Sequence, residues 1–156
     1  MTRFNPKPDE MAWLTPYLML NDWEGSKRYY TKVFGFEHAF ELPGPNGKPV
    51  HGEYRYKGKT LFMCAPEGVM DSNPKTPKSR GSVDEPVGFY VYVDDVDAFT
   101  ETARAAGGEI VEEPADQFYG DRRVVIADPS GYRWTFASNF KVISPEELQG
   151  AMADAG

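Results

Sequence analysis

The chain nearly repeats itself at an offset of 73 residues, and this repeat limits the possible folds more than any other feature of the sequence. Residues 20–24 match residues 93–97, and both segments place acidic residues directly after an apolar run. Gly35 falls on Gly108, and Gly58 falls on Gly131. A duplicated segment of this length indicates two modules built alike, in which equivalent positions share one environment.

Each half has the same order of predicted elements, namely one strand, one helix and three further strands. In the first half we expect strands at 13–20, 36–42, 51–56 and 60–64 and a helix at 22–34. In the second half we expect strands at 87–93, 109–113, 122–127 and 132–138 and a helix at 95–106. Asp22 and Asp95 are the expected N-caps of the two helices. The sequence Ser-Pro-Glu-Glu at 144–147 is a capping box that begins a short C-terminal helix.

These elements predict an α+β fold made of two tandem βαβββ modules, at residues 13–64 and 87–138. The chain of 156 residues is then one compact domain, or two small ones that share a core. Residues 65–86 carry Pro, Ser, Gly and Lys without periodicity, so they form either the linker between the modules or a mobile lid. Residues 139–156 form a tail that includes the C-terminal helix.

Composition excludes several classes of function. The net charge of −7 disfavours nucleic acid as a partner, because phosphate binding needs clustered Lys and Arg. The single cysteine, Cys64, cannot form an internal disulfide, and its apolar neighbours favour a buried, inert thiol. The N-terminus has no signal-peptide core and no apolar run approaches bilayer length, so we expect a cytoplasmic protein without membrane contact.

The order of elements, with Asp-Val-Asp at 95–97 and Asp-Pro-Ser-Gly-Tyr at 128–132, resembles the vicinal oxygen chelate superfamily. This superfamily includes glyoxalase I, extradiol dioxygenases and bleomycin-resistance proteins. The segment 116–122, the pair Arg133-Trp134 and the tail at 142–147 are similar, more narrowly, to its PhnB-like branch. The resemblance implies the glyoxalase/bleomycin-resistance fold, in which the two modules form a curved mixed-sheet cleft. It does not fix the chemistry, because this fold hosts isomerases, oxygenases and plain binding proteins.

The resemblance also implies where a divalent metal would bind in catalytic members. Those members use His, Gln or Glu side chains from the first and last strand of each module. Aligned through the repeat, the four positions here are Thr15, Phe62, Gly88 and Thr135. None of them supplies the imidazole or carboxylate that such metals require. We therefore predict no cofactor and no metal in the usual place, and a divalent metal only at a non-standard site.

Strand alternation assigns a second set of residues to the face of those four positions. We predict that the ligand-binding residues are Trp13, Thr15, Tyr17, Phe62, Tyr90, Tyr92, Arg133 and Thr135. Tyr17 and Tyr90 are equivalent in the repeat and are expected to face each other. Either these aromatic side chains fill the centre of the fold or a dimer contact, or they bind a planar or aromatic ligand with a polar or anionic edge.

His51 and Glu53 lie two residues apart and are expected to share the face of Phe62. They either brace the sheet by a hydrogen bond or form an acid–base pair or partial metal site. Asp121 and Arg122 are oppositely charged neighbours at a strand start, where such a pair is usually structural; alternatively, the loop at 116–122 closes one end of the cleft and contacts the ligand.

Two functions remain open from the sequence. The first is a metal-free protein that binds a small aromatic or cationic molecule, as bleomycin-resistance proteins do. The second is a lyase or isomerase in the glyoxalase mould, with His51, Glu53 and Tyr90 as catalytic candidates and a displaced metal or none. In either case we expect a homodimer, because a βαβββ module alone leaves edge strands and an aromatic face exposed.

Overall fold

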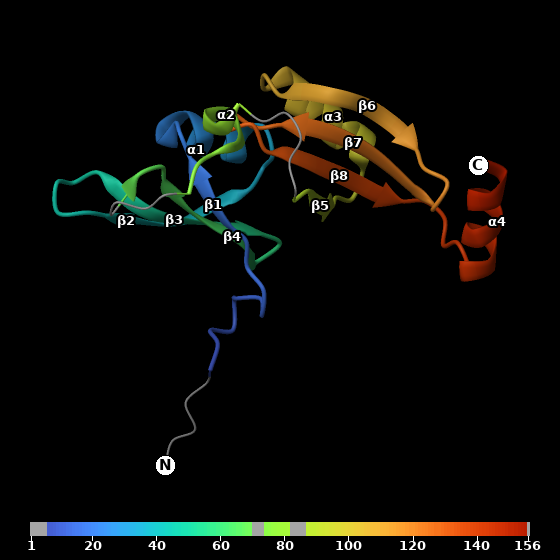
Figure 1. Cartoon of the computed structure of the whole chain (residues 1–156), viewed down its shortest axis with the longest axis horizontal. Coiled ribbons are helices and arrows are strands. Elements are labelled where there is room, and N and C mark those ends of the chain that lie inside the picture. The colour runs from blue at the N-terminus through green and yellow to red at the C-terminus, as the bar shows by residue number, and fades with distance from the viewer. Residues whose placement is uncertain (1–5, 70–73, 82–86, 156) are drawn as a thin grey trace, which may run out of the picture. The chain divides into compact units, whose positions relative to one another are not determined.

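The computed structural model describes residues 6–69, 74–81 and 87–155, and the chain divides into two compact units (Figure 1). The first unit contains the elements from β1 to α2 together with the turn at 129–131. The second unit contains the elements from β5 to α4. Each unit is described by itself.

Each unit contains one four-stranded mixed sheet with the same strand order. The first sheet has the order β1-β4-β3-β2, with strands Tyr17–Leu20, Glu37–Pro43, Pro49–Tyr56 and Lys59–Pro66 for β1 to β4. The second has the order β5-β8-β7-β6, with strands Phe89–Tyr92, Glu109–Asp116, Asp121–Ala127 and Arg133–Asn139 for β5 to β8. In both sheets the first strand pairs parallel to the last, and the other pairs are antiparallel. The predicted α+β fold of two βαβββ modules is confirmed.

The helices begin where the acidic residues predict. Helix α1 (Trp23–Lys32) is capped by Asp22, whose Oδ1 accepts a hydrogen bond from the Gly25 amide at 2.9 Å. Helix α3 (Val96–Ala105) is capped in the same way by Asp95. Helix α4 (Pro145–Ala155) follows the predicted capping box, in which Ser144 and Glu147 each accept a hydrogen bond from the other's backbone amide. These local signals are therefore sufficient to place the helix starts.

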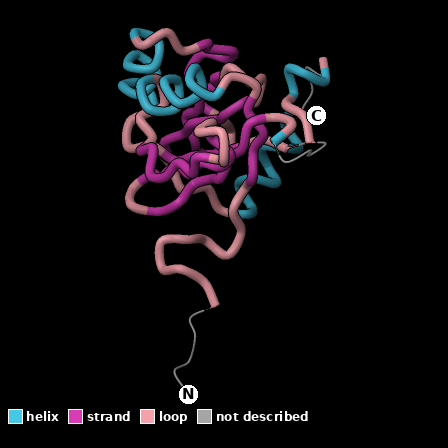
Figure 2. Tube along the Cα trace, turned by 90° about the vertical axis from the view of Figure 1, so that its left-hand side faces the viewer, coloured by secondary structure: helices cyan, strands magenta, loops and turns pink. Residues whose placement is uncertain are grey.

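The first strand is shorter than predicted. It begins at Tyr17 rather than at Trp13, and residues 6–16 form a loop (Figure 2). Pro16 explains the late start, because proline has no amide hydrogen to donate to a neighbouring strand.

The stretch from 65 to 86 is partly structured. Strand β4 runs on to Pro66, and a short helix, α2 (Pro77–Arg80), was not predicted. Thr76 caps this helix, and the Glu67 carboxylate accepts hydrogen bonds from the Thr76 amide and from the Ser79 hydroxyl, the latter at 2.9 Å. A four-residue helix has too few residues to leave a periodic pattern in the sequence. Residues 70–73 and 82–86 of this stretch lie outside the described residues.

The two cores are aromatic and lie between each sheet and its helix. In the first unit Phe62 is 1% exposed, and its ring centroid lies 5.0 Å from those of both Tyr30 in α1 and Tyr54 in β3. In the second unit Phe136 is fully buried, and its ring lies 4.4 Å from that of Phe99 in α3. One face of each sheet is therefore a packed core, which leaves the opposite face available for a site.

The position of Phe62 corrects the sequence prediction, which put this residue on the face of Tyr17. The register pairs Tyr56 with Lys59 and Arg55 with Thr60, but then Tyr54 with Phe62, so Leu61 is an extra residue in β4. Such a β-bulge reverses which face the following residues occupy relative to the turn. The equivalent pairing of β7 with β8 has no shift. Met63, and not Phe62, is consequently the residue beside Tyr17.

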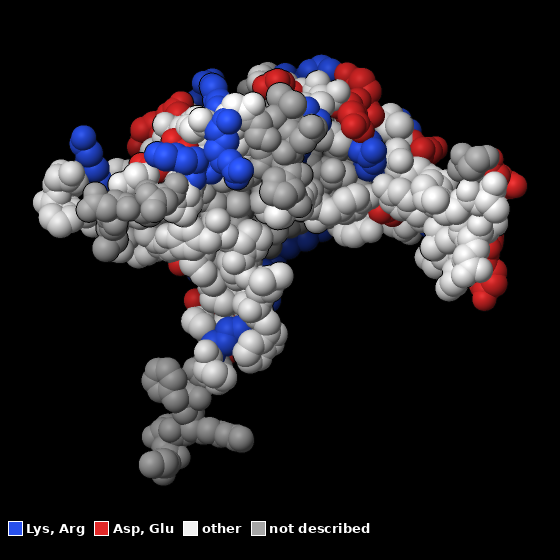
Figure 3. Space-filling view, viewed as in Figure 1, with Lys and Arg blue, Asp and Glu red and all other residues white. Residues whose placement is uncertain are grey.

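No helix among the described residues is both long and apolar enough to cross a membrane. On the face drawn in Figure 3, Lys and Arg side chains lie among Asp and Glu side chains.

Candidate functional site

The open face of the second sheet, opposite α3, carries exposed aromatic side chains. Tyr90 and Tyr92 alternate in β5 with the buried Val91, and they are 45% and 57% exposed. Their ring centroids lie 5.6 Å apart at an angle of 58°. Thr135 pairs with Tyr90 in the neighbouring strand β8 and shares this face. Three of the predicted ligand-binding residues are thus neighbours on one surface.

A buried carboxylate fixes the two tyrosines. Both hydroxyls donate to Oδ2 of Asp121 in β7, each at 2.9 Å. Asn139 in β8 donates to the other oxygen, Oδ1, at 2.8 Å. Asp121 is only 3% exposed. We call Tyr90, Tyr92 and Asp121 the tyrosine clamp.

These hydrogen bonds determine the protonation of the tyrosine clamp. Burial by itself would raise the pKa of the Asp121 carboxyl, but the hydrogen bonds from Asn139, Tyr90 and Tyr92 together hold it below its usual value. Burial, together with hydrogen bonds to Tyr119 and Asp121, raises the pKa of Tyr90 well above its ordinary value. The hydrogen bond to Asp121 raises the pKa of Tyr92 as well. At neutral pH the carboxyl is therefore ionised and both phenols keep their protons.

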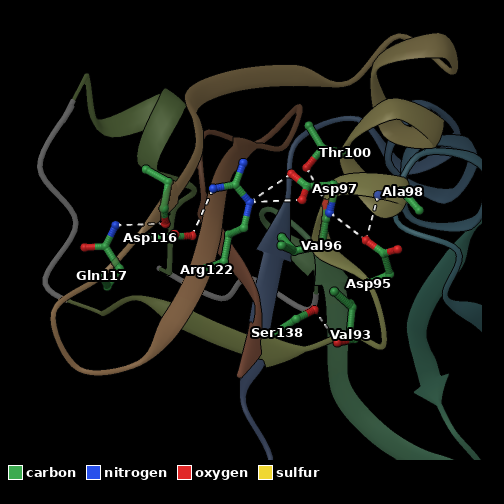
Figure 4. A network of polar contacts seen from close by, with 11 residues as sticks. Val93, Asp95, Val96, Asp97, Ala98, Thr100, Asp116, Gln117, Arg122 and Ser138 are labelled. Atoms are coloured by element: carbon green, nitrogen blue, oxygen red, sulfur yellow. Dashed lines mark hydrogen bonds and ion pairs between the residues drawn. The ribbon is translucent and has the colours of Figure 1, made fainter. Parts of the chain in front are cut away.

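Arg122 does not neutralise Asp121, although the two are adjacent in the sequence. Strand alternation directs Arg122 to the opposite face. There its Nε lies 3.0 Å from both carboxylate oxygens of Asp97 in α3, and its Nη1 lies 3.0 Å from Asp116 in β6 (Figure 4). The expected structural role of this strand start therefore holds for Arg122, which ties a helix to the sheet, but its partners are Asp97 and Asp116.

The first sheet also has a polar and aromatic open face. The Tyr17 hydroxyl lies 2.8 Å from Nδ1 of His51, and Nε2 of His51 lies 3.2 Å from the carboxylate of Glu53. A neutral imidazole that is protonated at Nε2 donates to Glu53 and accepts from Tyr17. Phe40 of β2 lies next to these hydrogen-bonded side chains, with its ring centroid 6.2 Å from that of His51. Burial is the largest cause that raises the pKa of Tyr17, and the electrostatic effects of Cys64 and Glu53 raise this pKa further.

The remaining predicted site residues lie in different surroundings. Trp13 is 83% exposed in the loop before β1, where the Lys7 ammonium lies 5.4 Å from its ring. Thr15 is half-buried in the same loop. Arg133 is exposed at the start of β8, on the face of Thr135. Tyr17 belongs to the first unit and Tyr90 to the second, and their juxtaposition stays a prediction.

Sequence reasoning missed the residue that organises this surface. Asp121 was interpreted as one half of a charge pair at a strand start, and nothing local distinguishes it from a solvated carboxylate. Its parity within β7 indicates the open face, but only the pairing of β7 with β8 and of β8 with β5 brings it near the tyrosines. That information is not available without the strand order.

Comparison with known proteins identifies a superfamily and several relatives. A family model described as the Glyoxalase/Bleomycin resistance protein/Dioxygenase superfamily matches residues 11–136. The protein Mb0911c of Mycobacterium bovis is 33% identical over 144 residues, which cover 92% of this chain and 93% of that protein. The anthracycline biosynthesis protein DnrV of Streptomyces peucetius is 32% identical over 136 residues, which cover 84% of this chain but only 46% of DnrV.

Among solved structures, the fold is similar to that of TnmS3, an antibiotic binding protein from Streptomyces sp. CB03234. The TM-score is 0.59 and the sequence identity 19%, with 82% of this chain and 97% of TnmS3 covered. At this identity the likeness concerns the fold alone.

Proposed function

We propose that this protein, which belongs to the Glyoxalase/Bleomycin resistance protein/Dioxygenase superfamily, binds a small aromatic molecule on the open face of its second sheet. The single observation that carries the proposal is the tyrosine clamp. Two half-exposed rings are held by a buried carboxylate instead of being left to rotate in solvent. Rings that are fixed before binding lose little conformational entropy when a planar ligand stacks on them. The name of DnrV, an anthracycline biosynthesis protein, is compatible with this class of ligand.

The residues at the implied metal positions support binding without a metal. Once the bulge in β4 is taken into account, Met63 takes the place of Phe62 among the four implied metal positions. The other three positions are those of Thr15, Gly88 and Thr135. Two hydroxyls, one thioether and one glycine offer neither imidazole nor carboxylate, so this donor set does not fit the metals of the superfamily. Among the described residues, moreover, there is no group of three or more His, Cys, Asp or Glu that could hold a metal ion.

The proposal is tested by NMR titration with quinoline as a small planar probe. We expect the backbone signals of β5 and β8 to shift, and expect Tyr90→Ala or Tyr92→Ala to weaken binding about threefold to tenfold, since an aromatic pair contributes about 0.5–1.5 kcal/mol. Phe40→Ala is the matched control, because Phe40 is 46% exposed, much like Tyr90, but lies in the first unit. Binding that survives both tyrosine variants, or no binding at all, contradicts the proposal.

A second candidate function is proton transfer by the chain Tyr17–His51–Glu53, which corresponds to the lyase or isomerase alternative. The hydrogen bonds of His51 to both neighbours favour it, because a carboxylate that orients an imidazole is a common acid–base arrangement. Tyr90 fits this role less well than it fits binding, because its proton is donated to Asp121.

This alternative is tested by hydrogen–deuterium exchange at carbon in hydroxyacetone, a small carbonyl compound with acidic C–H bonds. Exchange catalysed by the protein and lost in both His51→Ala and Glu53→Gln would support it. His38→Ala, which changes the only other histidine, is the control. Exchange at the uncatalysed rate excludes the alternative for this compound.

We also propose a homodimer. Apolar side chains of the C-terminal tail support it, since Phe140, Val142 and Met152 are 56%, 88% and 56% exposed. Light scattering should give about twice the chain mass of 17.5 kDa, and a monomer at micromolar concentration would exclude the dimer.

A further inference from the structure

The tyrosine clamp contains a buried negative charge that no cation balances. Asp121 is 3% exposed, and no Lys, Arg or His among the described residues forms an ion pair with it. All three of its hydrogen-bond donors are neutral, namely two phenols and one amide. A carboxylate in this position keeps its charge and attracts cations in its vicinity.

The hydrogen bonds also determine what the tyrosine oxygens offer to a ligand. A phenol has one hydrogen to donate, and each of these hydrogens is used by Asp121. What remains on each oxygen is its capacity to accept, polarised by the carboxylate behind it; the Tyr90 oxygen also lies 3.5 Å from the Tyr119 hydroxyl, from which it can accept one hydrogen bond. The hydroxyl oxygens of the tyrosine clamp therefore accept hydrogen bonds from a ligand and do not donate them. The faces of the two rings carry the negative partial charge that favours cations.

The other charged groups on this face do not cancel the effect. Arg123 is paired with Glu112 at 2.8 Å. Arg133 lies at the opposite end of β8 from Asn139, six residues and thus about 20 Å along the strand. Lys141, whose backbone amide donates to the Gly120 carbonyl, has its ammonium 4.0 Å from the Glu147 carboxylate. None of these three cations forms an ion pair with Asp121.

We propose that the tyrosine clamp selects cationic aromatic ligands that carry N–H donors, and that Asp121 is the specificity-determining residue. This inference rests on the proposed binding function and adds the charge class of the ligand. Asp121 acts through the tyrosines and through its field, so it is a positioning residue and not a ligand contact. Neutral and anionic aromatic molecules of the same shape bind more weakly, because they gain nothing from the charge and place acceptors against acceptors.

The test compares three probes of one ring system near neutral pH. 4-Aminoquinoline is a cation with N–H donors, quinoline is neutral, and quinoline-4-carboxylate is an anion. We expect the wild-type protein to bind 4-aminoquinoline at least about tenfold more tightly than quinoline, and the anion most weakly.

Three variants complete the test. Asp121→Asn should weaken the binding of 4-aminoquinoline about tenfold more than it weakens that of quinoline, because quinoline loses only the fixation of the rings. Tyr92→Phe keeps the ring but removes one acceptor, and should weaken the binding of the cation about threefold more than that of quinoline. Glu101→Gln removes the same charge from α3 on the other side of the sheet, and should change neither probe.

The outcomes separate the two proposals. Equal binding of the cation and quinoline by the wild-type protein, or equal losses for both in Asp121→Asn, overturns the charge selection and leaves aromatic binding intact. No binding of any probe overturns both. If Asp121→Asn does not fold, the wild-type series and Tyr92→Phe still decide the question.

Discussion

Replacing Phe62 with alanine is expected to destabilise the first unit by about 4 kcal/mol. The side chain is 1% exposed and lies against the rings of Tyr30, Tyr54 and Phe36. Removing a fully buried phenyl group loses about 2–3 kcal/mol of transfer free energy. The cavity and the lost contacts between aromatic rings add about 1–2 kcal/mol more. A residue that lined an open ligand-binding face, as the sequence suggested for Phe62, would show no such cost.

The assay is urea denaturation followed by circular dichroism. With a slope of about 2 kcal/mol per molar urea, the midpoint should fall by about 2 M. Phe40→Ala deletes the same group from a side chain that is 46% exposed on the open face, and should cost roughly half as much or less. Equal losses in the two variants would refute the bulge at Leu61 and the core position derived from it. If Phe62→Ala is too unstable to measure, Phe62→Leu should still cost roughly 1–2 kcal/mol.

Three further predictions concern single residues. Gly120→Ala should cost about 3 kcal/mol in thermal or urea denaturation, because Gly120 has φ +94° and a Cβ there would lie 1.9 Å from the carbonyl oxygen of Lys141; a neutral effect would contradict this geometry. The lowered pKa of Asp121 means that its stabilising contribution is complete above the ordinary carboxyl pKa, about 4, and is lost as the pH falls through the lower value of the folded state. Asp121→Asn should therefore be less stable than the wild-type protein mainly above about pH 4. A difference in stability that stays constant down to strong acid would contradict this prediction. Cys64 is fully buried and burial raises its pKa to about 12, so the native protein should not react with Ellman's reagent until it is unfolded.

Much of the fold follows from short-range signals in the sequence. Asp22 and Asp95 cap helices because a side-chain oxygen at that position satisfies amides within three residues. The capping box at Ser144 and Glu147 is equally local. A repeat then orders these signals into two equivalent modules, so the fold class does not depend on the details of any one strand.

The faces of the strands were predictable only up to the first irregularity. Tyr17 and Tyr90 are 73 residues apart and occupy equivalent positions, but Met63 and Thr135, also equivalent, are 72 apart. The difference of one residue comes from Leu61, the extra residue of the bulge in β4, which has no counterpart in the second sheet. A bulge has no reliable sequence signal, so any assignment of faces carried across it is inverted.

The tyrosine clamp depends on a different kind of information, the order of strands in the sheet. Asp121 and Arg122 invite interpretation as a charge pair, yet adjacent residues of a strand point to opposite faces, so the carboxylate must find donors elsewhere. It finds them two strands away, across β8, a span of about 10 Å. Ala137, which lies opposite Tyr92 in β8, is fully buried and small, so a phenol can cross above it. A buried carboxylate held in this way by neutral donors stays ionised without an ion pair, which is the physical ground for seeking its function in a ligand that carries the opposite charge.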